Sequence, residues 1–116
     1  MSDQPEIDKF GTKKWRQNGC CHRLDGPAVI YENGDQEWYQ NDRRHRTDGP
    51  AVIRADGSRF WYQNGLLHRL DGPAIIWPNG SLRWWIDDRR YSLNEYLEKN
   101  NKLTQEQKVM MLLKYG

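Results

Sequence analysis

The sequence predicts a mainly β fold, an elongated single-layer antiparallel sheet of consecutive β-hairpins that is closed by a C-terminal α-helical cap. Three observations predict it. The heptapeptide that begins at His68 is repeated from His22 and from His45, which sets a period of 23 residues. Asn33-Gly34 stands between two short β-branched and aromatic runs, which is a strong hairpin signal. After residue 91 the apolar pattern changes from a period of two to a helical one.

A fixed period of this length indicates repeated units that bury their apolar surface against their neighbours. The repeats occupy 1–91, with a half repeat at about 7–25 and full repeats at about 26–48, 49–71 and 72–91. The polar start of the chain, Met1 to Glu6, is predicted to be frayed. Three further residue types recur with the same period of 23: Trp15, Trp38, Trp61 and Trp84; Asn18, Asn41 and Asn64; Gly11, Gly34, Gly57 and Gly80.

Composition restricts the class of protein. The 116 residues suit one domain, and six Trp and six Tyr can bury a large area despite the polar bias. A net charge of +2 is too small to indicate binding to nucleic acid or to an anionic membrane. No signal peptide is expected, and the sequence contains no apolar run of membrane-spanning length. Cys20 and Cys21 are adjacent, so that pairing them would strain the backbone, and we expect a reduced, cytoplasmic protein.

Within the unit 26–48, Asn33-Gly34 predicts a two-residue turn with positive φ at both positions. That turn places Val29 opposite Trp38 and Ile30 opposite Glu37. A second turn comes at Asn41-Asp42. One face of the sheet is then predicted to carry Trp38 with Val29, Trp61 with Val52, and Trp84 with Ile75. The other is predicted to carry Ala28, Ile30, Tyr39, Ala51, Ile53, Tyr62, Ala74, Ile76 and Trp85.

The repeat resembles a known family. The pattern Tyr62-x-Asn64-Gly65-x-x-His68-x-x-x-Gly72 is similar to the MORN (membrane occupation and recognition nexus) repeat, which also has a period of 23 residues. Arg follows the His where Gly is usual, and Asp-Gly-Pro-Ala replaces Gly-x-Gly. The chain therefore resembles, over about 7–91, the MORN variants of bacterial, phage and giant-virus proteins. The resemblance implies consecutive hairpins and a scaffolding or binding role, and it carries no catalytic residues.

Two short helices are expected at 92–116. Ser92 with Glu95 and Thr104 with Gln107 have the spacing of capping boxes, and we expect the helices to meet around 100–101. The last repeat is the most apolar, so the helices are predicted to dock there and to close the open end of the array. Its apolar face is predicted to contain Ile75, Trp77, Leu82, Trp84 and Ile86.

The sequence does not favour an enzyme. Equivalent residues of neighbouring hairpins lie ~9–10 Å apart, so His22, His45 and His68 cannot share a metal ion, and no cofactor or metal site is expected. Each imidazole is instead predicted to bond a turn carbonyl or the next Asp. Asp25, Asp48 and Asp71 are predicted to cap backbone N–H groups in their turns. No Ser-His or Cys-His pair and no phosphate-binding glycine loop stands out.

The leading hypothesis is a non-enzymatic interaction protein that binds a protein partner through aromatic and arginine side chains. The family resemblance further implies a phage- or virus-encoded inhibitor of a host defence protein, acting in the host cytoplasm. One alternative is a binder that sequesters a nucleotide in an Arg-aromatic pocket, and another is a structural homo-oligomer. In a fourth interpretation the arginines bind no ligand and only cover aromatic rings on a solvated sheet. The candidate binding residues are Tyr39, Arg44, Arg46, Tyr62, Arg69 and Trp85.

Overall fold

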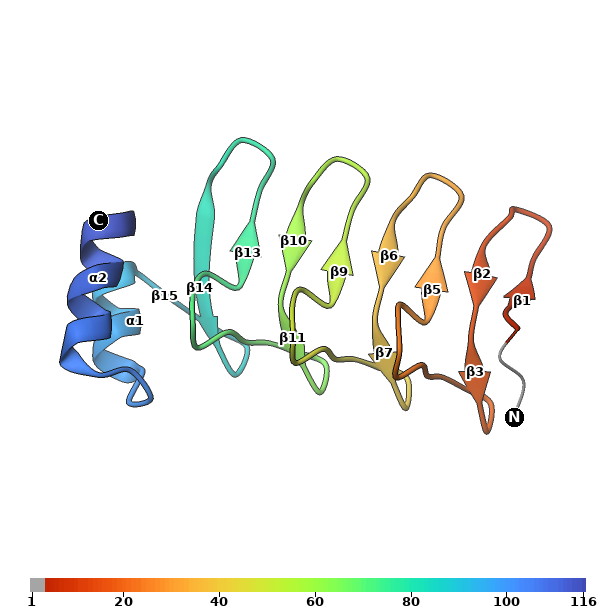
Figure 1. Cartoon of the computed structure of the whole chain (residues 1–116), viewed down its shortest axis with the longest axis horizontal. Coiled ribbons are helices and arrows are strands. Elements are labelled where there is room, and N and C mark those ends of the chain that lie inside the picture. Colours follow the sequence, from red (N-terminus) through yellow and green to blue (C-terminus); the bar gives the residue numbers. More distant parts are fainter. Residues whose placement is uncertain (1–3) are drawn as a thin grey trace.

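The computed structural model describes residues 4–116 and shows four hairpin units in a row, followed by two helices at the C-terminal end (Figure 1). The molecule measures 48 × 28 × 20 Å along its principal axes. Its main hairpins, together with β15 after β14, form one antiparallel sheet of nine strands in the order β1-β2-β5-β6-β9-β10-β13-β14-β15. The mainly β architecture with a helical C-terminal end is therefore confirmed. Met1–Asp3, at the start of the predicted frayed tail, lie outside the described residues.

The strands are short, and each unit contains two hairpins. The main hairpins use β1 (Glu6–Ile7), β2 (Lys13–Lys14), β5 (Val29–Ile30), β6 (Gln36–Glu37), β9 (Val52–Ile53), β10 (Arg59–Phe60), β13 (Ile75–Ile76) and β14 (Leu82–Ile86). A small hairpin then extends each unit at the lower edge of Figure 1. These use β3 (Arg16–Gln17), β4 (Cys20–Cys21), β7 (Tyr39–Gln40), β8 (Arg43–Arg44), β11 (Tyr62–Gln63), β12 (Leu66–Leu67) and, after β14, β15 (Arg89–Tyr91).

The predicted register of the main hairpins is wrong by one residue. Val29 pairs with Glu37, not with Trp38, and Ile30 pairs with Gln36. The turn between them has three residues rather than two, because Gly34 N donates to Tyr31 O and Tyr31 N donates to Asp35 O. Gly34 has a φ of 99°, whereas Asn33 is not among the residues with positive φ. This is the three-residue hairpin loop that ends in a left-handed glycine.

The small hairpins have the two-residue turn instead. Asn41 and Asp42 both have positive φ, at 52° and 65°, and Tyr39 pairs with Arg44 across them. The equivalent turn Asn64-Gly65 has the same left-handed pair, at 50° and 83°. The sequence therefore identified both turns of each unit, and it assigned the wrong length to the larger one.

The one-residue shift changes the assignment of the faces, since neighbouring residues of a strand point to opposite sides. Val29 now shares a face with Glu37, and the Tyr39 hydroxyl, 2.6 Å from the Glu37 carboxylate, lies on that side too. We call it the tyrosine face. The residues Lys13, Ile30, Gln36, Ile53, Arg59, Ile76 and Leu82 alternate with it and point to the other side. Trp38, Trp61 and Trp84 come next on that second side, the tryptophan face, so the predicted pairing of each Trp with Val29, Val52 or Ile75 does not occur.

Two capped helices complete the fold. α1 (Leu93–Lys99) and α2 (Gln105–Tyr115) begin at the capping boxes that the sequence predicts, with Ser92 and Thr104 as N-caps. The core cluster under them contains the buried Trp84, Tyr96 and Leu97. These helices contact the tryptophan face of the last unit, where the sequence placed them.

The predicted docking surface is correct in part. Leu82 and Ile86 pack against the helical core together with Trp84. Ile75 does not, because it pairs with Arg83 and so points to the tyrosine face. Trp77 is also elsewhere, with its ring edge-on to Phe60 at 5.4 Å between centroids. Both errors result from the register of the main hairpin.

Candidate functional site

The repeated heptapeptides form three motif loops, which we name after their variable third residue: the Leu24 loop (22–28), the Thr47 loop (45–51) and the Leu70 loop (68–74). Each is held by its arginine. Arg46 lies over the Trp38 ring at 4.0 Å, Nε donates to Asp48 at 2.9 Å and a terminal nitrogen donates to the Pro50 carbonyl at 3.0 Å. Arg23 and Arg69 make the same three contacts in their loops. The motif arginine therefore fastens its own loop to the sheet.

The rest of the motif fits around this arginine. A Cβ added to Gly49 would lie 3.0 Å from the Arg46 guanidinium carbon, and at Gly72 the corresponding distance to Arg69 is 2.7 Å. Glycine is needed here for space, since neither residue has positive φ. The alanine that ends each loop has no exposed surface. The main partner of each motif aspartate is the arginine, which the prediction of amide capping did not include.

The motif histidines connect successive units. His22 Nδ1 accepts the backbone N–H of Asn41 at 3.1 Å, and His45 accepts that of Asn64 at 3.0 Å. His68 does the same with Asp87 at 3.1 Å. The predicted partner, a turn carbonyl or the next Asp, is therefore wrong: each imidazole binds an amide of the following turn.

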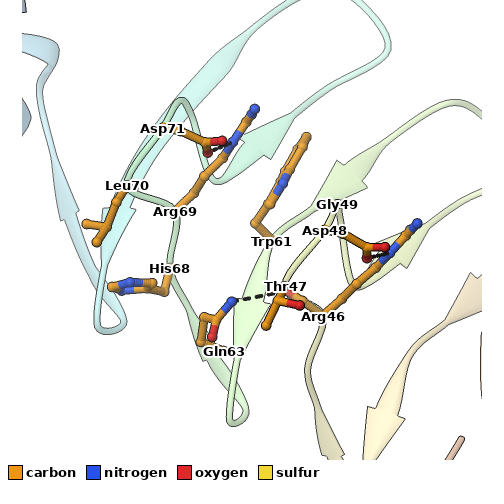
Figure 2. A pocket seen from close by; sticks show the side chains of 10 residues that line it. All are labelled: Arg46, Thr47, Asp48, Gly49, Trp61, Gln63, His68, Arg69, Leu70 and Asp71. Atoms are coloured by element: carbon orange, nitrogen blue, oxygen red, sulfur yellow. Dashed lines mark hydrogen bonds and ion pairs between the residues drawn. The ribbon is translucent and has the colours of Figure 1, made fainter. Parts of the chain in front are cut away.

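A groove lies between the Thr47 loop and the Leu70 loop on the tryptophan face (Figure 2). It encloses about 640 Å³. Figure 2 shows Trp61 standing between the Arg46–Asp48 and Arg69–Asp71 pairs, with Gln63 near Thr47. Gln63 Nε2 donates to Arg46 O at 3.0 Å, whereas no described residue donates to Thr47 O. The groove thus presents an exposed threonine and a free carbonyl between two arginine-fastened walls.

The preceding pair of loops forms an equivalent groove. It encloses about 490 Å³ between the Leu24 loop and the Thr47 loop, and it includes Trp38 and Gln40 in place of Trp61 and Gln63. Two open grooves therefore recur at the period of the sequence.

Beyond the Leu70 loop the chain continues as α1, which stands at the sequence position of a fourth motif loop. The Tyr96 hydroxyl donates to Arg69 O at 2.6 Å, and Asn100 Nδ2 donates to Leu70 O at 2.8 Å. The Tyr96 ring packs on Trp84 at 4.8 Å between centroids. Gly72, Pro73 and Trp84 are buried as a result, whereas their counterparts in the Thr47 groove, Gly49, Pro50 and Trp61, remain partly exposed.

The electrostatics of Tyr96 result from this burial. Removal from water raises the pKa of the Tyr96 hydroxyl to about 12. The group is therefore a neutral donor at physiological pH, as its bond to Arg69 O requires.

No protein-family model, curated protein or solved structure matches the chain. The family resemblance of the repeats thus has no independent support, and the function must be argued from the geometry. Within residues 4–116, no group of three or more His, Cys, Asp or Glu side chains could hold a metal ion. None of the helices described is long and apolar enough to span a membrane.

Three of the predicted binding residues lie together on the tyrosine face. The Arg44 guanidinium is 5.8 Å from the Tyr39 ring centroid and 5.5 Å from that of Tyr62. Beside them Glu37, only 4% exposed, accepts from the Tyr39 hydroxyl at 2.6 Å and lies 3.5 Å from Arg44. Burial, together with this carboxylate, raises the pKa of Tyr39. The opposite charges of Glu37 and Arg44 thus largely balance each other within the cluster.

The other three predicted residues are placed differently. Arg46 and Arg69 lie on the tryptophan face, where each fastens its own motif loop. For these two residues the interpretation that arginine covers an aromatic ring is confirmed. Trp85 lies on the tyrosine face in the strand position equivalent to Tyr62. Among the described residues, Arg44 Nε and Trp85 Nε1 are buried nitrogen atoms without an acceptor. The six residues therefore do not form one site.

Sequence reasoning missed the residues that shape the open grooves, above all Leu24, Thr47 and Gln63. A signal was present in the motif itself. Within His-Arg-x-Asp-Gly-Pro-Ala the third position alone changes, from Leu24 to Thr47 to Leu70. The fixed positions are those whose side chains or missing side chains build the loop, so the variable one is free to face outward.

Proposed function

We propose that the protein is a non-enzymatic protein-interaction module, built as a MORN-like hairpin solenoid, whose open grooves on the tryptophan face bind a protein partner. One observation carries the proposal. Two grooves are open, and beyond the Leu70 loop a helix of the same chain covers the corresponding loop surface through Tyr96 and Asn100. The chain itself is thus an example of what the surface between such loops accepts, namely polypeptide.

The chemistry of the motif supports this role. Its Arg and Asp side chains and its Gly are used to build the loops, so they supply rigid walls rather than reactive groups. A rigid concave surface loses little conformational entropy when a partner binds. The partly exposed Trp61 and Pro50 offer apolar area, and Thr47 O offers a hydrogen bond. These are properties of a binding surface.

The more specific proposal is that the partner is a host defence protein and that this chain is a phage- or virus-encoded inhibitor of it, acting in the host cytoplasm. It rests on the resemblance of the His-Arg-x-Asp-Gly-Pro-Ala repeats to variants found in such proteins. The grooves are compatible with it, because an inhibitor needs only to cover a surface.

The second candidate function is nucleotide sequestration on the tyrosine face. The position of Arg44 between two tyrosine rings favours it, since bases stack on such rings and phosphate binds guanidinium groups. The buried Glu37 carboxylate weighs against it, because a phosphate near Arg44 would also be near this negative charge. Protein binding in the grooves is therefore the stronger proposal.

Affinity capture tests both proposals. Tagged full-length protein would be exposed to a bacterial lysate, and bound proteins and small molecules would be identified by mass spectrometry. The variants are Thr47→Lys, at a residue that lines both grooves, and Arg44→Gln, which alters the tyrosine face. A stoichiometric protein retained by Arg44→Gln and lost by Thr47→Lys would support groove binding. A nucleotide that co-elutes without a protein, and is lost with Arg44→Gln, would overturn it in favour of sequestration.

A further inference from the structure

Helix α2 has two apolar sides, and only one of them is covered by the rest of the described chain. Met111 and Tyr115 pack against the helical core, together with Leu103 just before the helix. The opposite side is exposed and also apolar. Its members are Val109 at 45%, Met110 at 62%, Leu112 at 42% and Leu113 at 76% exposure. A surface helix normally has polar residues on its outer side, so this side of α2 has the composition of a contact surface.

The outer side of α2 is a stripe along the helix. Glu106, Met110 and Leu113 are separated by four and three residues, which places them on one face. Leu113 lies two residues from both Met111 and Tyr115, about 200° around the helix, so it points away from the core. Figure 1 shows α2 at the end of the row, beyond the last hairpin. The stripe is therefore accessible to another molecule.

A hollow borders this stripe and encloses about 350 Å³. Its lining consists of Leu103, Glu106, Gln107, Met110, Met111 and Asp71. The lining positions 103, 106, 107 and 110 have the spacing of the four residues that form a hole for a side chain of a facing helix. Leu113 is a protruding apolar side chain on the neighbouring turn. One surface of α2 therefore contains both a protruding side chain and a hole that can accept one.

The protruding side chain, the hole and two charges are placed symmetrically about Met110. Leu113 follows Met110 by three residues and the hole is centred about as far before it, so each is ~5 Å from Met110 along the helix. Lys114 follows Met110 by four residues, and Glu106 precedes it by four. Two antiparallel α2 helices with Met110 at a two-fold axis therefore place each Leu113 at the hole of the other copy. The same arrangement places each Lys114 beside Glu106 of the other copy.

We propose that α2 is a dimerisation surface, to which a second copy of this chain binds through its own α2 in antiparallel orientation. The partner is a second copy because the surface is complementary to itself both in shape and in the charges of Glu106 and Lys114. Each helix has 11 residues and is ~16 Å long, so the contact is at the small end of specific interfaces and the dimer is weak. This inference does not depend on what the grooves bind.

Sedimentation of the full chain over a range of concentrations tests the proposal. A dimer with a dissociation constant of about 10–100 μM is expected. Met110→Glu brings two carboxylates together at the two-fold axis, and it is expected to weaken dimerisation at least about tenfold. A chain that stays monomeric up to about 1 mM would overturn the proposal.

Leu24→Glu is the matched control. It makes the same change from an apolar to an acidic side chain on the first motif loop, where Leu24 is 76% exposed. Both Met110 and Leu24 are exposed, so neither change should affect folding, which circular dichroism checks. The control is expected to dimerise like the parent. A dimer that Leu24→Glu abolishes and Met110→Glu retains would use another surface and would overturn the proposal.

Charge reversal tests the antiparallel register. Glu106→Lys places two lysines together at each of two symmetric contacts, and Lys114→Glu places two glutamates there. Each single variant is expected to weaken dimerisation about threefold to tenfold at low salt. The double variant restores opposite charges, and its dissociation constant is expected within about threefold of that of the parent. Both changes oppose the helix dipole, so a more stable helix cannot explain this recovery. A double variant as weak as the single ones would overturn the proposal.

Discussion

The Thr47 loop and the Leu70 loop share one motif but differ in their surroundings. Both are fastened by an arginine that lies over a tryptophan and bonds an aspartate and a proline carbonyl. The Leu70 loop is covered by α1, which buries Gly72 and Pro73, whereas the Thr47 loop opens into a groove. The motif therefore builds the loop by itself, and the next unit of the chain, hairpin or helix, decides whether the loop borders an open groove or is part of the core.

The largest expected effect concerns the Leu70 end of the sheet, where the helices cover Trp84. Trp84→Ala removes a buried ring that contacts Tyr96 and Tyr115, and we expect a loss of about 3–5 kcal/mol in the free energy of unfolding. Trp61→Ala removes an equivalent but only partly buried ring, for which we expect about 2 kcal/mol. Urea unfolding measures both. Equal losses would show that the helices add no burial to the third loop.

The next effect tests whether Arg46 keeps the Thr47 loop in place. Arg46→Ala removes the cover of Trp38 and the donors to Asp48 and Pro50 O, and we expect a loss of about 2 kcal/mol. Arg46→Lys keeps the charge without the planar fork, so most of that loss should remain. The free energy of unfolding at moderate salt is the measurement. Full stability of Arg46→Lys would mean that only the charge matters.

Glycine substitutions compare the two loops directly. Gly72→Ala brings a Cβ to 2.7 Å from the Arg69 guanidinium carbon, and Gly49→Ala brings one to 3.0 Å from that of Arg46. Because α1 prevents the Leu70 loop from shifting, we expect Gly72→Ala to cost about 1 kcal/mol more than Gly49→Ala. Thermal unfolding of the two variants side by side measures the difference. The reverse order would indicate that the covered loop is the more adaptable one.

The smallest effect concerns one hydroxyl at the covered end. Tyr96→Phe removes the bond to Arg69 O, and we expect a loss of about 1 kcal/mol at neutral pH. Because folding raises the pKa of Tyr96 from the usual ~10 to about 12, its contribution is complete below pH ~10. It is lost as the pH rises from ~10 towards ~12, since the unfolded chain ionises first.

The control for this prediction is the slope of stability with pH. Tyr96→Phe should lose less stability than the parent between neutral pH and pH ~11, because it lacks the ionising group. Tyr39, whose pKa is also raised, stays in both proteins and gives the same residual slope. Identical slopes in the two proteins would mean that another tyrosine titrates with unfolding.

The sequence predicted the hairpin architecture, both turn positions, the two capped helices and, in part, the surface on which they dock. It missed the length of the larger turn because Asn33-Gly34 and Asn64-Gly65 are the same dipeptide in loops of different length. Pro78, directly before Asn79-Gly80, was a usable signal. Proline suits the second position of a type I turn, and that turn begins a three-residue hairpin loop.

The candidate site was less predictable, for a physical reason. Arg46 and Arg69 were chosen as arginines near aromatic rings, but such a pair serves equally well to fasten a loop. Only the structure distinguishes ligand binding from loop fastening, because it shows that Arg46 Nε and Arg69 Nε already donate to Asp48 and Asp71. The grooves depend on how far apart successive loops stand, which no single residue type encodes.

The bonds from each motif histidine to the following turn give the array a direction. His22 holds the turn at Asn41, His45 holds that at Asn64, and His68 holds that at Asp87. The first small turn, Asn18-Gly19, has no such histidine before it in the described part of the chain. Opening of one unit thus releases the turn of the unit after it. The unit before it also loses acceptors, because Cys21 N–H donates to the Asp42 carboxylate and Leu67 N–H to the Asp88 carboxylate. Local unfolding is therefore shared between neighbouring units, and protection of the turn amides against hydrogen exchange should be weakest at Asn18.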